Sequence, residues 1–431
     1  MSKKWLYLPI EVITRELDAK LILTYYAIKH NYNVVLAKQH KIFNNLESLP
    51  KGIIFSKAYP KNKKGKLFEA KEAGHAVVEL DEEGFFFTES SYLLHRTNEE
   101  LYKLMDQVYC WGKYQKDTLD NAYPHSKEKF IITGHPRFDL LNKKFHSLYT
   151  DEIARIQKQY GDFILVNTRF RSYNHPQGFR PKHVGMKNLY EQFIQMIKEL
   201  SEKYPNVNIV IRPHPRENFN SYQEELSGYK NVFIVHEGNI VKWILASLIT
   251  IHNGCTTGIE AFLLNKPVIS YLPVKYNELN HESLPDEVSI KVEKLDEIFT
   301  FINFNMSKES IKAIENKKII QKRKRILSNY YGALDGNLAY ENIIRLLDKI
   351  NLKSDGSLQN LLLHAETLNN NNDQKDSTIR DKAINLESSM EMKEEEIKTF
   401  FEKLNKIEGR ENKVIIRKFE RNFFEIVPDK N

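Results

Sequence analysis

Residues 208–217 read NIVIRPHPRE, an apolar strand that runs directly into a basic loop with two prolines. Ligands of open parallel sheets bind beyond the carboxyl ends of the strands, and Arg212 and His214 fall at such an end. A proline on each side of His214 stiffens the loop and fixes where the imidazole points. The stretch therefore predicts a parallel α/β sheet with a ligand site at this edge. A rigid loop with an exposed basic cluster is the alternative.

Two further stretches end a strand in the same way. Residues 252–261, HNGCTTGIEA, place main-chain amides and two threonine hydroxyls at a helix start, which is a binding site for phosphate. Glu260 then either accepts hydrogen bonds from a ribose or stabilises the helix N-terminus by about 0.3–1 kcal/mol. Residues 167–170, NTRF, are expected to contact the sugar or the phosphate, and an ordinary surface loop explains them equally well. The predicted contacts are Asn167, Arg169, Asn253, Thr256, Thr257 and Glu260.

The order of strands and helices predicts two domains. Short β-branched or aromatic runs alternate with helical patterns up to about position 350, which is typical of parallel sheets wrapped by helices. The alternation restarts after Tyr160, so we expect two successive doubly wound α/β units. The predicted domains are residues 1–155 and 156–350, followed by a tail of residues 351–431. We expect strands at 4–8, 33–37, 52–56, 75–80, 107–111 and 130–133, and then at 163–167, 207–212, 232–236, 248–252 and 267–272.

The first predicted unit has an acidic cluster at the end of its strand 75–80. Asp81, Glu82 and Glu83 follow one another there, and adjacent carboxylates repel each other. Because a turn needs only one of them, we assign all three as candidate catalytic residues. Asp81 and Glu83 also imitate a metal-binding acidic motif. Two doubly wound domains with basic groups at the phosphate need no divalent ion, so we expect neither a metal nor a cofactor.

Other strand ends are expected to complete a ring of polar groups at the same edge. These candidates are Glu11, Arg15 and Glu16 after the first strand, Lys57 after the third, and His135 and Arg137 after the sixth. Both acidic groups should then face a cleft between the domains. The alternative for Glu11 and Glu16 is that they only complement a helix N-terminus.

Composition and charge limit the class of protein. With 41% hydrophobic and 28% charged residues, the chain of 431 residues is expected to be globular. Its two cysteines are far apart, which indicates neither a disulfide framework nor a zinc site and favours a reducing cytoplasm. The net charge of +7 comes from 64 basic and 57 acidic residues. This weak excess suits phosphates, anionic sugars or anionic lipid at least as well as DNA, so we expect no nucleic acid partner.

The chain is predicted to work in the cytoplasm. Pro9 and Glu11 interrupt the first apolar run before it reaches the length of a signal peptide. No stretch approaches the roughly 20 apolar residues that span a bilayer. Any membrane association is therefore expected to be peripheral, at the inner face of the cytoplasmic membrane.

The tail has a different composition from the two predicted domains. Polar and turn-forming residues dominate from about residue 353, and a charged helix is expected over residues 391–406. We interpret the tail as a solvated helix or a flexible appendage. A minor hypothesis is a membrane-surface or partner-binding patch made of Phe419, Phe423, Phe424 and Ile426.

Taken together, these stretches resemble the bacterial surface carbohydrate biosynthesis proteins, a family that includes the retaining β-Kdo glycosyltransferases, where Kdo is keto-deoxy-octulosonic acid. The resemblance runs in order from about residue 4 to residue 345 and does not cover the tail. It is carried by residues 10–12, 15–21, 52–53, 56–57, 81–84, 134–139, 165–168, 212–215 and 258–261.

The resemblance implies a GT-B fold, with two Rossmann-like domains that face a central cleft. It also implies a glycosyltransferase of capsule or lipopolysaccharide synthesis that moves a sugar from CMP-Kdo, or a related CMP-activated ulosonic acid, to a glycan or lipid-linked saccharide. In the β-Kdo members an aspartate acts as nucleophile with a glutamate nearby. Asp81 and Glu16 are the closest matches, and the register within Asp81–Glu83 stays open. The family often has asparagine where this chain has His135.

Two other enzyme classes fit the same architecture. A sugar-nucleotide 2-epimerase would convert its substrate without an acceptor, and a polyol-phosphate transferase would prefer a CDP-polyol. A non-catalytic scaffold in glycan assembly is the alternative from a different class of protein. In that case, replacement of Asp81 or His214 by alanine would leave glycan synthesis intact.

Overall fold

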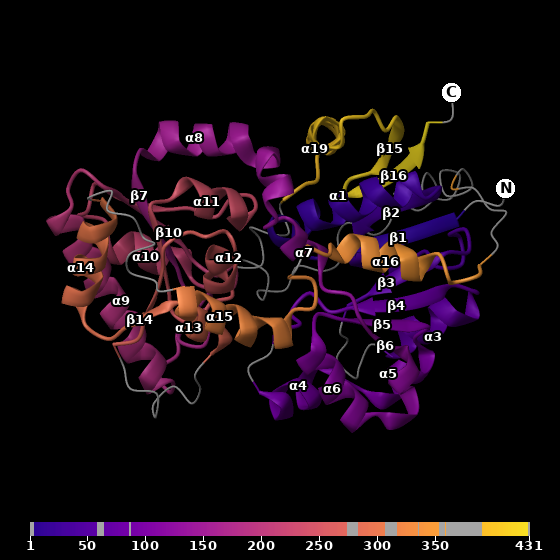
Figure 1. The fold of residues 1–431 in the computed structure, drawn as a ribbon, viewed down its shortest axis with the longest axis horizontal. Coiled ribbons are helices and arrows are strands. Elements are labelled where there is room, and N and C mark those ends of the chain that lie inside the picture. Colours follow the sequence, from indigo (N-terminus) through magenta and orange to yellow (C-terminus); the bar gives the residue numbers. More distant parts are fainter. Residues whose placement is uncertain are drawn as a thin grey trace. The chain divides into compact units, whose positions relative to one another are not determined.

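The computed structural model describes residues 4–57, 64–85, 88–273, 283–306, 317–334, 336–352, 358 and 390–429. These residues fall into two units, each with its own sheet (Figure 1). Unit 1 contains the described residues up to Leu148 and those from Ser328 onward. Unit 2 contains the described residues from Tyr149 to Leu327.

The sheet of unit 1 has the strand order β15-β16-β2-β1-β3-β4-β5-β6. The six strands β1 to β6 are parallel. They are buried apolar runs, as expected for a sheet covered on both faces. The strands are β1 Lys4–Ile10, β2 Tyr32–Lys38, β3 Ile53–Ser56, β4 Ala76–Leu80, β5 Gln107–Cys110, β6 Phe130–Ile132, β15 Val414–Glu420 and β16 Phe423–Pro428. The α-helices are α1 Ile13–Lys29, α2 Gln39–Phe43, α3 Lys64–Glu72, α4 Glu89–Arg96, α5 Glu99–Leu104, α6 Lys113–Ala122, α7 Pro136–Asp139, α16 Ala339–Leu347 and α19 Glu394–Glu408.

The sheet of unit 2 has the strand order β11-β10-β7-β12-β13-β14, all parallel. This is the order of a Rossmann sheet, in which the direction of winding reverses between the first and fourth strands, here β7 and β12. The strands are β7 Phe163–Asn167, β10 Asn208–Arg212, β11 Val232–Ile234, β12 Ile249–His252, β13 Val268–Tyr271 and β14 Ile290–Val292, with a separate short hairpin of β8 Asn174–His175 and β9 Gly178–Phe179. The helices are α8 Thr150–Tyr160, α9 Val184–Lys203, α10 Phe219–Glu225, α11 Ile240–Ala246, α12 Thr257–Leu263, α13 Leu284–Val288, α14 Leu295–Met306 and α15 Lys317–Tyr330.

The domain division differs from the predicted one in two places. Helix α8 belongs wholly to unit 2, which therefore starts before the predicted boundary at residue 155. The chain also returns to unit 1 from Ser328 onward, well before the predicted end of the second domain at residue 350. Asp139 holds the returning helix α16, because its carboxylate accepts hydrogen bonds from the amides of Ala339 (2.8 Å) and Tyr340 (2.9 Å). Helical periodicity predicts α16 but does not say which sheet its apolar face covers.

The end of the chain is a structural part of unit 1. Helix α19 confirms the predicted charged helix. The prediction of a purely helical or flexible tail is corrected by the hairpin β15–β16, which pairs antiparallel with β2 and covers an otherwise open sheet edge. Phe423, Phe424 and Ile426 are buried in this sheet, so they cannot form the proposed membrane patch. Residues 353–357 and 359–389 of the predicted tail lie outside the described residues.

Glu408 at the end of α19 ties this helix to α1 and to the segment before α8. Its carboxylate contacts Tyr26 Oη (2.6 Å), Lys29 Nζ (3.2 Å) and Lys144 Nζ (2.7 Å). Burial alone raises the pKa of Glu408, but the hydrogen bonds from Lys144, Tyr26 and Lys29 outweigh it and lower this pKa to about 2. Because the folded pKa is depressed, the stabilisation is complete above the ordinary glutamate pKa. It is lost as the pH falls toward 2.

Glu408→Gln should therefore lower the stability of the protein at pH 7 and have a smaller effect near pH 3. Urea unfolding of the variant and the unchanged protein at both pH values measures the difference. Glu402→Gln, on the same helix, is the control. An equal loss for Glu408→Gln at both pH values would show that the charge of Glu408 does not stabilise the contact.

Candidate functional site

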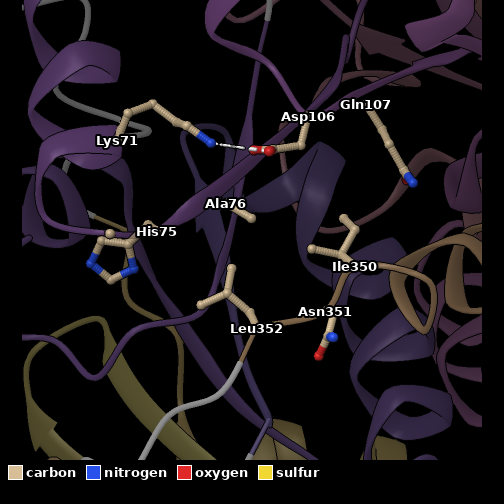
Figure 2. Close-up of a pocket in the computed structure, with 9 residues that line it drawn as sticks. Lys71, His75, Ala76, Asp106, Gln107, Ile350, Asn351 and Leu352 are labelled. Carbon is tan, nitrogen blue, oxygen red and sulfur yellow. Dashed lines mark hydrogen bonds and ion pairs between the residues drawn. The ribbon is translucent and has the colours of Figure 1, made fainter.

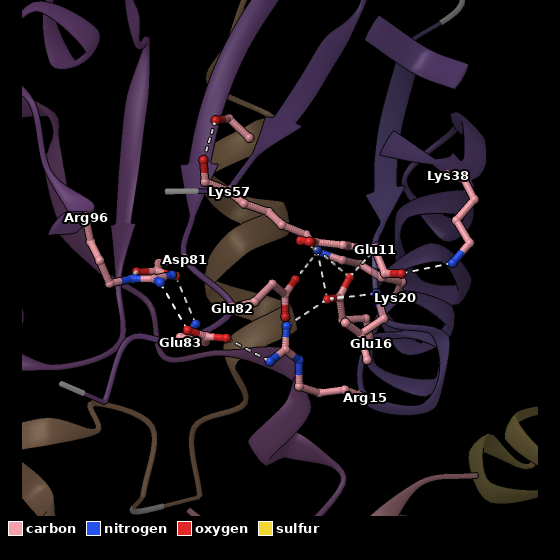
Figure 3. A network of polar contacts seen from close by, with 12 residues as sticks. Glu11, Arg15, Glu16, Lys20, Lys38, Lys57, Asp81, Glu82, Glu83 and Arg96 are labelled. Atoms are coloured by element: carbon pink, nitrogen blue, oxygen red, sulfur yellow. Dashed lines mark hydrogen bonds and ion pairs between the residues drawn. The ribbon is translucent and has the colours of Figure 1, made fainter. Parts of the chain in front are cut away.

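Unit 1 gathers its candidate residues at the carboxyl edge of its sheet. Glu11 follows β1, Lys57 follows β3 and Asp81 follows β4, as the sequence predicts. His135 comes three residues after the end of β6. The strand order 2-1-3-4-5-6 reverses between β1 and β3, and ligands of doubly wound sheets bind at such a reversal. The cluster therefore lies where the topology favours a ligand site (Figure 3).

Glu16 holds the turn between β1 and α1 together. Its carboxylate accepts hydrogen bonds from the amides of Glu11 (2.9 Å) and Val12 (3.3 Å) and from Arg15 Nη2 (3.1 Å). Lys57 Nζ lies 2.8 and 2.7 Å from its two oxygens, and the Glu16 side chain is fully buried. We expected Glu16 to act as the base for an acceptor hydroxyl. In this arrangement its oxygens are engaged by four donor groups, so it positions its neighbours.

The three consecutive carboxylates are all paired with cations, which relieves their repulsion. Asp81 accepts hydrogen bonds from Arg96, including Nε at 2.9 Å, and from the amide of Glu83 at 2.9 Å. Glu83 pairs with both Arg15 and Arg96, at 3.0 Å each. Glu82 turns to the other side, towards Lys20 at 2.7 Å. The adjacent acids are thus stable because each contacts at least one cation: Asp81 and Glu83 share Arg96, and Glu82 pairs with Lys20.

Glu82, Lys20 and His135 form a buried group whose side chains are each less than 5% exposed. His135 Nδ1 accepts a hydrogen bond from the amide of Arg137 (3.0 Å), so Nε2 carries the proton and lies 3.1 Å from Glu82. Burial lowers the pKa of His135, which favours the neutral ring. Burial raises the pKa of Glu82, but Lys20 and His135 more than compensate and hold it well below its usual range. Glu82 is therefore a buried ionised carboxylate.

The main chain around this acidic turn is also fixed. Trp111 Nε1 donates a hydrogen bond to the carbonyl oxygen of Asp81 (2.6 Å). A Cβ at Gly84 would lie 2.3 Å from Trp111, so only glycine allows this approach. Arg137 Nη1 lies 3.4 Å from the carbonyl oxygen of Glu82, and its guanidinium covers the Trp111 ring. Burial, and then Asp81, raise the pKa of Glu79 on β4 to about 8, so Glu79 adds no charge at neutral pH.

Exposure separates the carboxylates that a substrate can reach from those that it cannot. The side chains of Glu11 and Glu83 are each 54% exposed. Asp81, Glu16 and Glu82 are at most 2% exposed.

The sequence analysis did not predict Lys20 and Arg96, the cations that pair with Glu82 and Asp81. Lys20 could have been found, because it is a lysine on the apolar face of α1, four residues after Glu16. No feature of the sequence pointed to Arg96.

Unit 2 places two asparagines at its own reversal point. Asn167 ends β7 and is paired in register with His252 at the end of β12, directly before Asn253. Both asparagines are 6% exposed. Within the described part of the chain, neither Oδ1 nor Nδ2 of Asn253 has a hydrogen-bond partner, and the same holds for Oδ1 of Asn167. A buried polar group without a partner costs about 1–3 kcal/mol, so these amides are suited to a ligand.

Arg169 lies near the same turn. It is partly buried two residues after Asn167. Burial lowers its pKa, while Cys255 and Asp286 act in the opposite direction. Its guanidinium therefore lies within electrostatic reach of the turn that leads into α12. The contacts predicted for Asn167, Arg169 and Asn253 with a sugar or a phosphate stay a prediction.

Arg212 and His214 lie at the carboxyl end of β10, as the sequence predicts, but Arg212 is engaged by the main chain of unit 2. The Arg212 guanidinium donates to the carbonyl oxygens of Glu237 (2.8 Å) and Gly238 (3.0 Å) and lies over the Trp243 ring. Burial lowers its pKa to about 10, so it stays charged at neutral pH. Arg212 thus fixes the main chain of the loop that follows β11. His214 is partly exposed, and its Nδ1 accepts a hydrogen bond from the amide of Arg216 (3.1 Å), which leaves the proton on Nε2.

Glu217 organises these loops, and sequence reasoning did not assign it to the site. Its carboxylate accepts hydrogen bonds from the Phe170 amide (2.8 Å), Thr168 Oγ1 (3.0 Å), Tyr222 Oη (2.5 Å) and the His214 amide (3.3 Å). It therefore joins the ends of β7 and β10. Burial raises its pKa to about 7 despite these hydrogen bonds. Its place in the RPHPRE stretch was the only signal for this role.

The turn before α12 differs in part from the expected phosphate site. The amides of Gly258 and Glu260 donate to the carbonyl oxygens of Cys255 (2.9 Å) and Thr256 (3.2 Å), so they are already used by the turn. Thr257 Oγ1 lies 3.3 Å from Cys255 Sγ. The Glu260 side chain is buried, which favours its role in the helix over contact with a ribose.

A cavity among the described residues of unit 1 lies away from the acidic turn of that unit. It has a volume of about 420 Å³ and lies at the amino ends of β4 and β5, opposite the carboxyl edge (Figure 2). Its charged residues, Lys71 and Asp106, pair with each other at 2.8 Å. Both ring nitrogens of its His75 contact main-chain groups, of Gly52 and Leu46. The polar groups are thus satisfied internally, and we assign no function to this cavity.

Among the described residues, no group of three or more histidine, cysteine, aspartate or glutamate side chains has an arrangement that could hold a metal ion. None of the described helices has the length and apolar character needed to cross a membrane.

Comparison with known proteins shows the fold. No family model and no curated protein matches the sequence. The wall teichoic acid polymerase TagF, in a structure soaked with CDPG, is 12% identical with a TM-score of 0.52, over 80% of this chain and 88% of that one. A UDP-N-acetylglucosamine 2-epimerase is 15% identical with a TM-score of 0.50, over 83% and 100%. The UDP-GlcNAc 2-epimerase from Neisseria meningitidis, bound to UDP-GlcNAc, is 17% identical with a TM-score of 0.49, over 81% and 100%.

At such low identity these similarities establish the architecture alone. The chain has a GT-B type of fold, with two Rossmann-like domains built on parallel sheets. This confirms the predicted fold class. The charged clusters at the carboxyl edges are then the candidate site of each domain.

Proposed function

We propose that this protein is a glycosyltransferase of bacterial surface polysaccharide synthesis that uses a nucleotide-activated sugar. Unit 2 binds the nucleotide part of the donor, and unit 1 handles the acceptor. The observation that carries the proposal is the pair of buried asparagines, Asn167 and Asn253, at the reversal point of a Rossmann sheet. Within the described residues, Oδ1 of Asn167 and both amide atoms of Asn253 lack a hydrogen-bond partner.

The chemistry of unit 2 supports a nucleotide. Amide oxygens and nitrogens recognise the edges of a base or ribose hydroxyls, and the Arg169 guanidinium matches a phosphate. His214, with its proton on Nε2, offers a further donor from the neighbouring strand end. The solved structures with a similar fold include one with UDP-GlcNAc and one with CDPG, both nucleotide-activated compounds.

The chemistry of unit 1 supports an acceptor with hydroxyl groups. Glu83 is exposed and forms ion pairs with Arg15 and Arg96. Arg15 also pairs with the buried Glu16, and Arg96 with the buried Asp81. We propose that Glu83 receives the proton of the acceptor hydroxyl, as a general base. Asp81 then positions Arg96. A covalent adduct on Asp81, as in a retaining reaction, would require its carboxylate to leave Arg96.

For the donor, we propose CMP-Kdo or a related CMP-activated ulosonic acid. The support is the resemblance of residues 81–84, 134–139 and 212–215 to the family with β-Kdo transferases. In the reaction, the bond between the anomeric carbon and the CMP phosphate breaks, the acceptor oxygen bonds to that carbon, and CMP leaves with the electron pair. Cationic and polar groups stabilise the departing phosphate, so neither a metal nor a cofactor is needed. The acceptor is a glycan or a lipid-linked saccharide in the cytoplasm.

Nucleotide release from a panel of donors tests this proposal. Purified protein is incubated with CMP-Kdo, CDP-glycerol, UDP-GlcNAc or a GDP-hexose, with and without acceptor glycan, and free nucleotide is measured. We expect acceptor-dependent release of CMP from CMP-Kdo, and at least a tenfold loss in Glu83→Gln but not in the exposed control Glu69→Gln. Interconversion of UDP-GlcNAc without acceptor would instead show an epimerase, and consumption of CDP-glycerol a polyol-phosphate transferase.

A further inference from the structure

Helix α15, Lys317–Tyr330, has the highest net charge of any helix or strand among the described residues. Its sequence KKIIQKRKRILSNY contains six basic residues and no acidic one. The net charge of the whole chain is +7, and this helix alone contributes +6. Such a concentration of charge on one helix is unlike the rest of the chain, where acids and bases are nearly balanced.

The charges lie together on one side of the helix. At 3.6 residues per turn, five of the six cations fall on about half of the circumference, and all five are exposed. The exposed cations are Lys317, Lys318, Lys322, Lys324 and Arg325. The sixth, Arg323, is turned inward and donates a hydrogen bond to the carbonyl oxygen of Ser289 (2.8 Å). The opposite face includes the buried Leu327.

An apolar side chain borders this basic face. Ile319 is 44% exposed and lies one turn from Lys322, so the two are neighbours on the helix surface. Lys317, Lys322 and Lys324 form no ion pair among the described residues. A basic face with an exposed apolar residue at its border is the pattern of helices that lie on anionic membranes.

We propose that the exposed face of α15 docks the protein on an anionic phospholipid bilayer. Lysine and arginine side chains attract anionic headgroups, and Ile319 enters the boundary between headgroups and acyl chains. No aromatic residue is present among positions 317–329, so the face lacks the stacking platform of a single-strand nucleic acid site. The proposal concerns where the protein works, and it holds whichever sugar the donor carries.

Vesicle co-sedimentation without any nucleotide tests this proposal. The full chain should bind phosphatidylcholine vesicles that contain phosphatidylglycerol, much less so vesicles of phosphatidylcholine alone, and the binding should weaken at high salt. The variant K317Q/K322Q/K324Q removes three charges, which should lower vesicle binding about a hundredfold. The variant K317R/K322R/K324R keeps the charge and should bind like the unchanged protein.

The matched control changes the net charge by the same amount at other exposed lysines of unit 2. K158Q/K182Q/K230Q should bind anionic vesicles within about twofold of the unchanged protein. Equal loss in both glutamine variants, or no binding of the unchanged protein to anionic vesicles, would overturn the proposal. Tighter binding to a DNA duplex than to the vesicles would overturn it in favour of a nucleic acid partner. Because no donor is present, these outcomes leave the donor assay unaffected.

Discussion

Lys20→Met is expected to lower the free energy of unfolding of unit 1 by about 3–5 kcal/mol. The Lys20 ammonium lies 2.7 Å from Glu82, and the two side chains are 4% and 3% exposed. Removal of the ammonium leaves an ionised carboxylate inside the protein without its paired cation, beside the neutral His135 ring. The loss of one partner of a buried ion pair is costly because the remaining charge cannot regain its hydration.

Urea unfolding of the unchanged protein and of Lys20→Met measures this effect. Hydrogen exchange of the α1 amides shows that the loss occurs in unit 1. In the double variant Lys20→Met/Glu82→Gln, much of the stability should return, because the uncompensated charge is gone as well. Lys64→Met is the matched control, since Lys64 and Glu100 also form a close pair, at 2.6 Å, but are 49% and 62% exposed. That change should cost less than about 1 kcal/mol. A similar small cost for Lys20→Met would contradict the buried ion pair.

Asn253→Leu is expected to change stability and ligand binding in opposite directions. Both amide atoms of Asn253 are buried without a partner in the described part of the chain, and leucine has a similar volume. Its introduction removes an unsatisfied polar group, so the free energy of unfolding of unit 2 should rise by about 1–2 kcal/mol. If the amide binds the nucleotide, the same change removes two hydrogen bonds. It should then weaken nucleotide binding roughly tenfold to a hundredfold.

Calorimetric titration with CMP and UDP, together with thermal unfolding, measures both effects. Asn231→Leu is the control, because this asparagine donates to the carbonyl oxygens of Tyr204 (3.2 Å) and Val207 (3.0 Å) in the same unit. The control should lose stability and keep nucleotide affinity. A loss of stability in Asn253→Leu without a change in affinity would show that Asn253 is not a ligand group.

Much of the fold and part of the candidate site could be predicted from local sequence. Buried parallel strands are continuous apolar runs, so β1 to β6 and then β7, β10, β11, β12 and β13 stood out. The short β14 and the hairpin β8–β9 did not. Polar residues directly after such runs lie at one edge of a parallel sheet by construction. This is why Glu11, Lys57, Asp81, Asn167 and Asn253 were found without coordinates.

Only the tertiary structure decided how these side chains are paired. Arg96 lies 15 residues after Asp81, and Lys20 lies 62 residues before Glu82, so no local pattern predicts either contact. The same reason explains why Glu16 was expected to be reactive and is instead surrounded by donors. The exposure of a side chain likewise depends on the whole fold. It distinguishes the exposed Glu83 from the buried Asp81 and Glu82.

By itself, the sequence determined which segments become strands and helices and which polar residues follow the strands, because these properties depend on neighbours along the chain. The tertiary structure decided the strand order, the return of residues after Ser328 to unit 1, and the hairpin that covers β2. It also decided which carboxylates are buried with cations. These features depend on segments that are distant in sequence, and their contacts are set by packing over the whole sheet.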